Sequence, residues 1–158
     1  FRELIKSVGC DGLEMVETGF AVEYSDILHK CKIDAFGTDG YLYDLKTTES
    51  CSPRDFLREI LIYKYHLQAY VYKALFEKEF KIKPLGFRIV AIEKSAPNVG
   101  AVFTMGPDIM TEGFQLWESC IATFLKCTKE NNWPGYMDAA NPQPIVLDFP
   151  KKESKIVF

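Results

Sequence analysis

Three segments in the first third of the chain have the pattern of apolar and polar residues expected of β-strands. They cover residues 13–24, 29–36 and 41–47, and around the turn 37–40 apolar and polar positions alternate with a period of two. We therefore predict a three-stranded meander. Gly19 lies inside the first segment and predicts a bulge or a break there.

Longer segments carry the signals of helices. Ser52 is a favourable helix cap, Pro53 suits the first helical position, and Asp55 places an acid in the first turn. We predict one long helix from this start to about Phe80, ended by the segment 83–86. The other predicted elements are a short helix over 1–8, strands over 87–93 and 101–105, and a helix over 107–129.

This order of elements predicts an α/β fold: a single domain with a mixed central β-sheet flanked by helices, in the order α-β-β-β-α-β-β-α. The helix between the third and fourth strands forms a crossover, so the strand at Phe87 should run parallel to the strand at Tyr41. The 158 residues, 47% of them hydrophobic, are enough for one real core. We expect residues 1–136 to form this core and the Pro-rich segment 137–158 to be an irregular tail.

Two carboxylates and a lysine share one phase of the predicted hairpin, opposite to the apolar residues around them. If Gly40 is left-handed in a three-residue loop, Asp34 lies opposite Asp44 with Cβ atoms about 5 Å apart, and Lys46 follows on the same face. Charged residues on a hairpin are often only a solvated face. However, like charges so placed destabilise a sheet unless a cation or proton neutralises them, and both acids sit in apolar runs. The pattern favours a divalent metal site.

The long predicted helix has one polar position of interest. Tyr65, Gln68 and Tyr72 are spaced i, i+3 and i+7 and so share a helix face. An amide in an apolar stretch needs hydrogen-bond partners, and for Gln68 these could be a phosphate oxygen, a metal-bound water or a backbone group. For Tyr72 an ordinary core position remains the alternative, because aromatic stripes on helices are usually core.

Composition narrows the functional classes. A net charge of −3 argues against a general nucleic-acid coating protein but not against a nuclease, which needs acidic metal ligands. The five cysteines contain no C-x-x-C motif, so we expect free thiols, with an iron–sulfur site on Cys120 and Cys127 as the alternative. Two histidines make a His-rich metal site improbable. We expect no membrane span and no signal peptide. Free thiols are typical of a reducing cytoplasm, so we expect a cytoplasmic protein.

Three motifs together resemble the PD-(D/E)XK nuclease superfamily. They are Ile-Asp ending at Asp34, Asp-Leu-Lys-Thr-Thr from Asp44, and Tyr-His-Leu-Gln-Ala-Tyr-Val-Tyr from Tyr65. Gln68 and Tyr72 match the Q-x-x-x-Y motif of the RecB-type branch. With Asn-Trp-Pro at 132–134, the chain is similar to the RecE (exodeoxyribonuclease VIII) nuclease domains of phages and prophages, over roughly residues 17–136.

This resemblance implies a metal-dependent phosphodiesterase, a hydrolase that resects linear double-stranded DNA from 5′ to 3′ for recombination. By the resemblance, Asp34, Asp44 and the Leu45 carbonyl bind Mg²⁺, for which Mn²⁺ can substitute. Lys46 would orient and activate the attacking water. Gln68 and Tyr72 would position the DNA strand or ordered waters.

The resemblance also implies double-stranded DNA ends as substrate, a homo-oligomeric ring, a single-strand-annealing partner, and the cytoplasm of a bacterial or phage-infected cell. The family further uses an acid or histidine on a helix before the first strand. Glu3 is a poor match, so we expect this ligand upstream of Phe1, in an absent N-terminal part of the domain. Glu17 and Glu23 are the fallback candidates.

Three other functions remain open from the residues. One is a restriction- or repair-type endonuclease on the same core, with the same metal chemistry. Another is a non-catalytic DNA-binding module that keeps the nuclease fold. The last is an unrelated acid-rich α/β domain in which the constellation is accidental.

Overall fold

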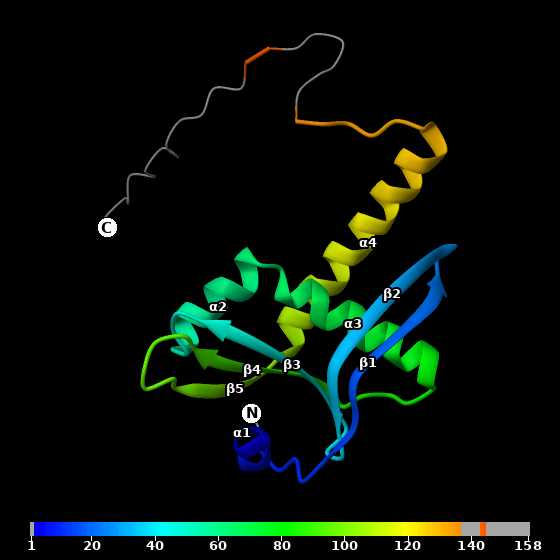
Figure 1. Cartoon of the computed structure of the whole chain (residues 1–158). Coiled ribbons are helices and arrows are strands. Elements are labelled where there is room, and N and C mark those ends of the chain that lie inside the picture. Colours follow the sequence, from blue (N-terminus) through cyan, green and yellow to red (C-terminus); the bar gives the residue numbers. More distant parts are fainter. Residues whose placement is uncertain (1, 137–142, 145–158) are drawn as a thin grey trace, which may run out of the picture. The chain divides into compact units, whose positions relative to one another are not determined.

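The computed structural model describes residues 2–136 and 143–144 (Figure 1). The chain divides into two compact units, 1–122 and 123–158, which are described separately below. The elements are α1 (Arg2–Ser7), β1 (Leu13–Tyr24), β2 (Ile27–Gly37), β3 (Tyr41–Thr48), α2 (Pro53–Ile62), α3 (Tyr65–Phe80), β4 (Gly86–Glu93), β5 (Gly100–Thr104) and α4 (Pro107–Glu130).

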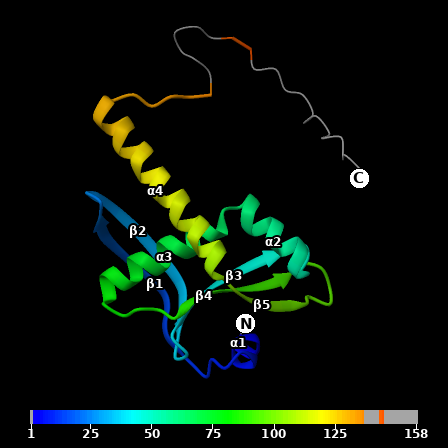
Figure 2. The ribbon, with the colours of Figure 1, turned by 180° about the vertical axis from the view of Figure 1, so that it is seen from behind.

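The first unit contains a five-stranded mixed sheet with the order β1-β2-β3-β4-β5. Strands β3 and β4 are parallel and the other neighbours are antiparallel, as the crossover predicted. Helices flank the sheet, and Figures 1 and 2 show α2 and α3 together on one side of it. The predicted α/β fold class is thereby confirmed.

The turn between β2 and β3 has the predicted geometry. Gly40 is left-handed with φ +79°, and its N–H donates to the Gly37 carbonyl at 2.9 Å. This loop sets the register that pairs Phe36 with Leu42 and Ala35 with Tyr43.

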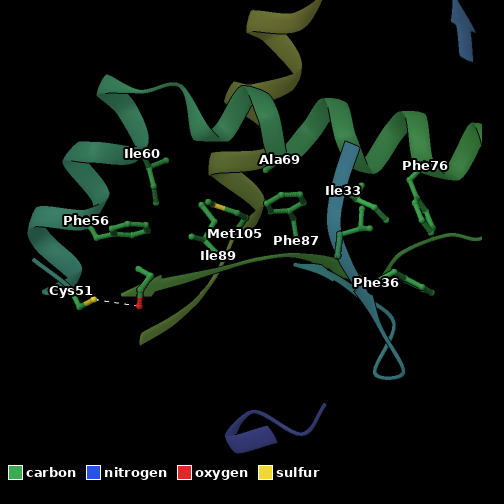
Figure 3. Packing of buried hydrophobic residues seen from close by; sticks show 12 residues of the cluster. Ile33, Phe36, Cys51, Phe56, Ile60, Ala69, Phe76, Phe87, Ile89 and Met105 are labelled. Carbon is green, nitrogen blue, oxygen red and sulfur yellow. Dashed lines mark hydrogen bonds between the residues drawn. The ribbon is translucent and has the colours of Figure 1, made fainter. Parts of the chain in front are cut away.

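The prediction of one helix from Ser52 to Phe80 is wrong, because the chain forms α2 and then α3. Lys64 lies between them with φ 59° and ψ 35°, a left-handed conformation that ends the first helix. Its carbonyl accepts the N–H groups of Leu67 and Gln68 and so begins the second. Neither glycine nor proline marks this break. Figure 3 shows the two helices running at an angle.

The irregularity predicted in β1 is also misplaced. Gly19 pairs regularly with Lys32 of β2, whereas the register shifts between Leu13 and Met15. A glycine can occupy a regular strand position when its neighbours supply the packing, so Gly19 alone was a weak signal.

The main core lies between the sheet and helices α2 and α3 (Figure 3). Its buried members include Ile33, Phe36, Leu42, Phe56, Ile60, Ala69, Phe76, Phe87 and Ile89. A second cluster combines Ile5 of α1 with Ala35, Tyr43 and Val90. Helix α3 also packs against the β1–β2 ribbon through a third cluster, which includes Cys31, Leu75 and Trp117. Strand β3 therefore contributes Leu42 to the main core and Tyr43 to the second cluster.

The second unit begins within α4. The Phe124 and Trp133 rings contact edge to face at 5.6 Å, and the Asn132 N–H donates to the Cys127 carbonyl at 3.1 Å. The predicted tail 137–158 lies outside the described residues except for 143–144. Within the described part of the chain, no helix is both long and apolar enough to span a membrane.

Candidate active site at the hairpin and helix α3

Asp34 and Asp44 lie where strands β2 and β3 separate. The backbone pairing of the two strands includes Ala35 with Tyr43 and goes no further, so the two acids follow one residue beyond its end. Asp34 Oδ2 accepts the Leu45 N–H at 2.7 Å. The predicted register brings Asp34 and Asp44 to the end of the β2–β3 pairing, but the two residues are not a backbone-paired couple as we expected. The Asp34 carboxylate accepts the Leu45 N–H at this point.

Asp44 is the buried acid of this site, with only 3% of its surface exposed. Its Oδ1 accepts a hydrogen bond from Gln68 Nε2 at 2.7 Å, which ties β3 to α3. Its Oδ2 lies 2.6 Å from Lys46 Nζ. Apart from this ion pair, Oδ2 is buried and accepts no other hydrogen bond from the described residues.

The electrostatics of Asp44 disfavour its charge. Burial raises the pKa of the Asp44 carboxyl and is the largest influence. Lys46 opposes this effect through its hydrogen bond and its charge, whereas the nearby negative charge of Asp34 raises the pKa further. The net pKa is above its ordinary value. A second cation beside the two acids would favour the ionised form.

Lys46 is held between the acid and an aromatic ring. Its ammonium lies 5.0 Å from the centre of the Tyr65 ring, in addition to its contact with Asp44. Such a contact with a ring face stabilises a partly desolvated cation. The side chain is 22% exposed, so the ammonium is positioned but still reaches solvent.

Gln68 connects the carboxylate to Tyr72. Burial raises the pKa of the Tyr72 hydroxyl, and a hydrogen bond with Gln68 partly offsets that rise. The Tyr72 ring also packs edge to face on Phe87 at 6.5 Å. Tyr72 therefore packs against the core and contacts Gln68, and a role in positioning DNA or ordered waters stays a prediction.

The residues present fit a hard divalent cation. Two carboxylates approach each other closely enough for the charge of Asp34 to raise the pKa of Asp44, and Lys46 is the one described partner of the buried Asp44 Oδ2. Among the described residues, no group of three or more His, Cys, Asp or Glu side chains could hold an ion together. Mg²⁺ commonly binds proteins through one or two carboxylates and completes its shell with water and phosphate oxygens, so two suffice.

The fallback ligands are not drawn into the site. Glu17 forms an ion pair with Lys32, and Glu23 is exposed on β1. We therefore assign neither of them to the metal.

Sequence reasoning missed two contacts near the site. The spacing predicts Tyr65 on the same helix face as Gln68 but not the position of its ring beside Lys46. The Thr48 hydroxyl donates to Glu59 Oε1 at 2.8 Å, which joins the end of β3 to α2. The spacing of Tyr65 could have indicated the first contact, whereas the second depends on the fold alone.

The mixed sheet, with two acids and a lysine where its central hairpin opens, places the chain in the restriction-endonuclease-like class of folds. A crystal structure from Eubacterium rectale, described as a "Putative exonuclease", shares this fold with a TM-score of 0.66 and 18% sequence identity. The likeness covers 91% of this chain and 61% of that one.

The chain belongs to the family described as "PDDEXK-like domain of unknown function (DUF3799)", whose model matches residues 9–142. Membership confirms the resemblance to the PD-(D/E)XK nuclease superfamily, while the narrower resemblance to RecE stays a prediction. No curated protein gave a significant match.

Proposed function

We propose that this chain is the catalytic domain of a Mg²⁺-dependent exodeoxyribonuclease that resects linear double-stranded DNA from 5′ to 3′ for recombination, as RecE-type enzymes do. The observation that carries the proposal is the buried Asp44, which Lys46 and Gln68 contact directly while Asp34 adds a second negative charge. A buried acid whose charge is disfavoured, in contact with a lysine and an amide, is typical of catalytic sites.

In this proposal Asp34, Asp44 and the Leu45 carbonyl hold the ion. When bound, Mg²⁺ supplies Lewis-acid polarisation and charge neutralisation at the scissile phosphate, and Mn²⁺ can substitute. The Lys46 ammonium orients and activates the attacking water and offsets negative charge that develops on the phosphate. Because Gln68 donates to Asp44 Oδ1, it fixes that carboxylate, and Tyr72 acts through Gln68.

The description of the Eubacterium rectale protein as a "Putative exonuclease" supports exonuclease action over the endonuclease alternative. The chain spans 61% of the length of that protein, so features of a larger assembly are proposals as well. These features are a homo-oligomeric ring around DNA, a single-strand-annealing partner and a cytoplasmic location. A non-catalytic DNA-binding module is disfavoured because Asp34, Asp44 and Lys46 are all present and close together.

The test uses an end-labelled linear duplex and a covalently closed circle of the same sequence. We expect Mg²⁺-dependent release of nucleotides from the linear duplex, loss of release in chelator, and no cleavage of the circle. Cleavage of the circle at a comparable rate would replace the exonuclease by an endonuclease. No cleavage of either DNA with Mg²⁺ or Mn²⁺ would contradict the proposal.

A further inference from the structure

At the junction of α2 and α3, the side chains of Tyr65 and Tyr63 form a stacked pair that begins beside Lys46. The Tyr65 ring lies 5.0 Å from the Lys46 ammonium, and the Tyr63 ring stacks on Tyr65 with centroids 5.6 Å apart and planes at 30°. The junction connects helices that leave it in different directions (Figure 1). The two stacked rings therefore begin at the candidate catalytic lysine and continue to the surface.

The ring of Tyr63, the outer of the two, is largely exposed to solvent. Tyr63 is 62% exposed, and its neighbour Ile62 is 68% exposed. Tyr63 holds the end of α2 only through its backbone, whose N–H donates to the Glu59 carbonyl at 2.8 Å. One face of its ring rests on Tyr65, so the opposite face is available to a flat partner.

The backbone beside Tyr63 is conformationally unusual. Lys64 adopts a left-handed conformation with φ 59°, which costs a non-glycine residue about 1 kcal/mol or more. This conformation ends α2 at the point where Tyr63 projects. It also leaves the Lys64 side chain exposed next to the stacked rings.

The side chains around the two rings carry positive charges, which attract a phosphate backbone, and negative charges, which repel it. Lys64 adjoins Tyr63 in the chain. Lys94, which directly follows β4, is close enough for its charge to lower the pKa of Tyr65 and for Tyr63 to raise the pKa of Lys94. The Lys94 ammonium forms an ion pair with Glu49 at 2.9 Å, and the negative charge of Glu59 raises the pKa of Tyr65. The mixed charge favours binding through ring faces rather than through phosphates alone.

We propose that Tyr63 and Tyr65 form a stacking platform for an unpaired base next to the scissile phosphate, with Lys64 beside the strand. The proposal rests on the nuclease function proposed above and adds how the enzyme holds a separated DNA strand. Aromatic rings bind bases without sequence preference because every base has a π-face. The platform would then position the nucleotide whose phosphate Lys46 approaches.

The first test measures binding apart from cleavage. A single-stranded oligonucleotide with 2-aminopurine at its end is titrated with protein in Ca²⁺, and both quenching and anisotropy are followed. Stacking contributes about 1–3 kcal/mol per base, so Tyr63→Ala and Tyr63→Leu should each weaken binding by about 5- to 150-fold. Tyr63→Phe keeps the ring and should stay within about twofold of the wild type.

Leucine is the informative replacement because it keeps apolar surface but has no flat ring. If Tyr63→Leu binds and quenches like the wild type, the platform is refuted, and the exposed patch is instead a surface for a protein partner. Failure of the wild-type protein to bind the oligonucleotide also refutes it. Leu85→Ala is the matched control: this residue is 72% exposed and precedes β4, at the opposite end of the β3–β4 pair from Lys94.

The second test is single-turnover cleavage of linear duplex in Mg²⁺. Tyr63→Leu should raise the protein concentration needed for half-maximal rate more than it lowers the rate at saturation. Ring-dependent binding without cleavage by the wild type would uphold the platform and contradict the nuclease proposal. If Tyr63→Leu cleaves and binds like the wild type, the platform is contradicted and the nuclease proposal is upheld.

Discussion

Neutralising Asp44 should stabilise the metal-free protein, although the residue is buried and hydrogen-bonded. Asp44→Asn keeps the size of the side chain and an oxygen that can accept from Gln68 Nε2, which is 2.7 Å from Oδ1. It removes a charge that burial and Asp34 disfavour. It also removes the contact with Lys46, whose side chain is 22% exposed and can turn to solvent.

The size of the effect follows from these opposing changes. Leaving a charge buried costs about 1–3 kcal/mol or more, while a partly exposed ion pair contributes about 0–1 kcal/mol. The raised pKa of Asp44 shows that the first effect exceeds the second. We expect a net gain of about 0.5–2 kcal/mol, the usual range when an active-site conflict is removed. For a domain of this size this corresponds to about 1–8 °C in Tm.

The gain should depend on pH in a defined direction. Because the folded-state pKa of Asp44 is raised, its favourable contribution is complete below the ordinary value of 3.8 and is lost as the pH rises through the folded-state pKa. Asp44→Asn has no carboxyl group to titrate at this position and does not lose this stability as the pH rises. The stability difference should therefore be small near pH 3.8 and grow toward neutral pH.

The assay is urea denaturation in chelator across this pH range, repeated with Mg²⁺ at neutral pH. Mg²⁺ should stabilise the wild type by mass action and leave the mutant nearly unchanged, so their order converges or reverses. Asp39→Asn is the contrasting control, because Asp39 accepts from Arg88 Nη1 and the Tyr43 hydroxyl, both at 2.6 Å, and should lose about 1.5–3 kcal/mol. A less stable Asp44→Asn, or a difference independent of pH, would refute the reasoning.

Other predictions concern the chemistry and the packing. Lys46→Arg should lower single-turnover cleavage by about 10²–10³-fold with little change in DNA affinity, because a planar guanidinium does not replace a compact ammonium. Gln68→Ala should lower the rate by about 10²-fold and leave Mn²⁺ binding by calorimetry nearly intact; normal cleavage would make Gln68 a purely structural residue. Gly113→Ala should cost about 1–3 kcal/mol in thermal unfolding, because its Cβ would lie 2.2 Å from the His66 carbonyl oxygen. Gly106→Ala, with nothing within 4 Å, should not show this packing cost.

The sequence was sufficient for the hairpin because its signals are local. The alternation of apolar residues and the left-handed Gly40 determine the register, and that register brings Asp34 and Asp44 together. The parallel pairing of β3 with β4 was also predictable, because a helical crossover permits little else. The spacing predicted that Gln68 shares a helix face with Tyr65 and Tyr72, but the Asp44 carboxylate was not among the partners expected for its amide.

The features that were not predicted depend on tertiary packing. No sequence signal accompanies the left-handed Lys64, so the break between α2 and α3 was missed, and with it the exposed Tyr63 beside Tyr65. The apolar run around Asp44 indicated at least partial burial, but not what covers the residue. The structure buries it because α3 covers that side of β3, where Gln68 binds its carboxylate.

The central claim is that Asp34, Asp44 and Lys46 carry out metal-dependent phosphodiester cleavage. The most direct measurement compares wild type and Asp44→Asn in single-turnover release of nucleotides from an end-labelled linear duplex with saturating Mg²⁺. An amide is a much poorer ligand for a hard cation than a carboxylate. We predict release by the wild type and a loss of at least about 10²–10³-fold in a mutant that remains folded. Wild-type rates from Asp44→Asn would contradict the account.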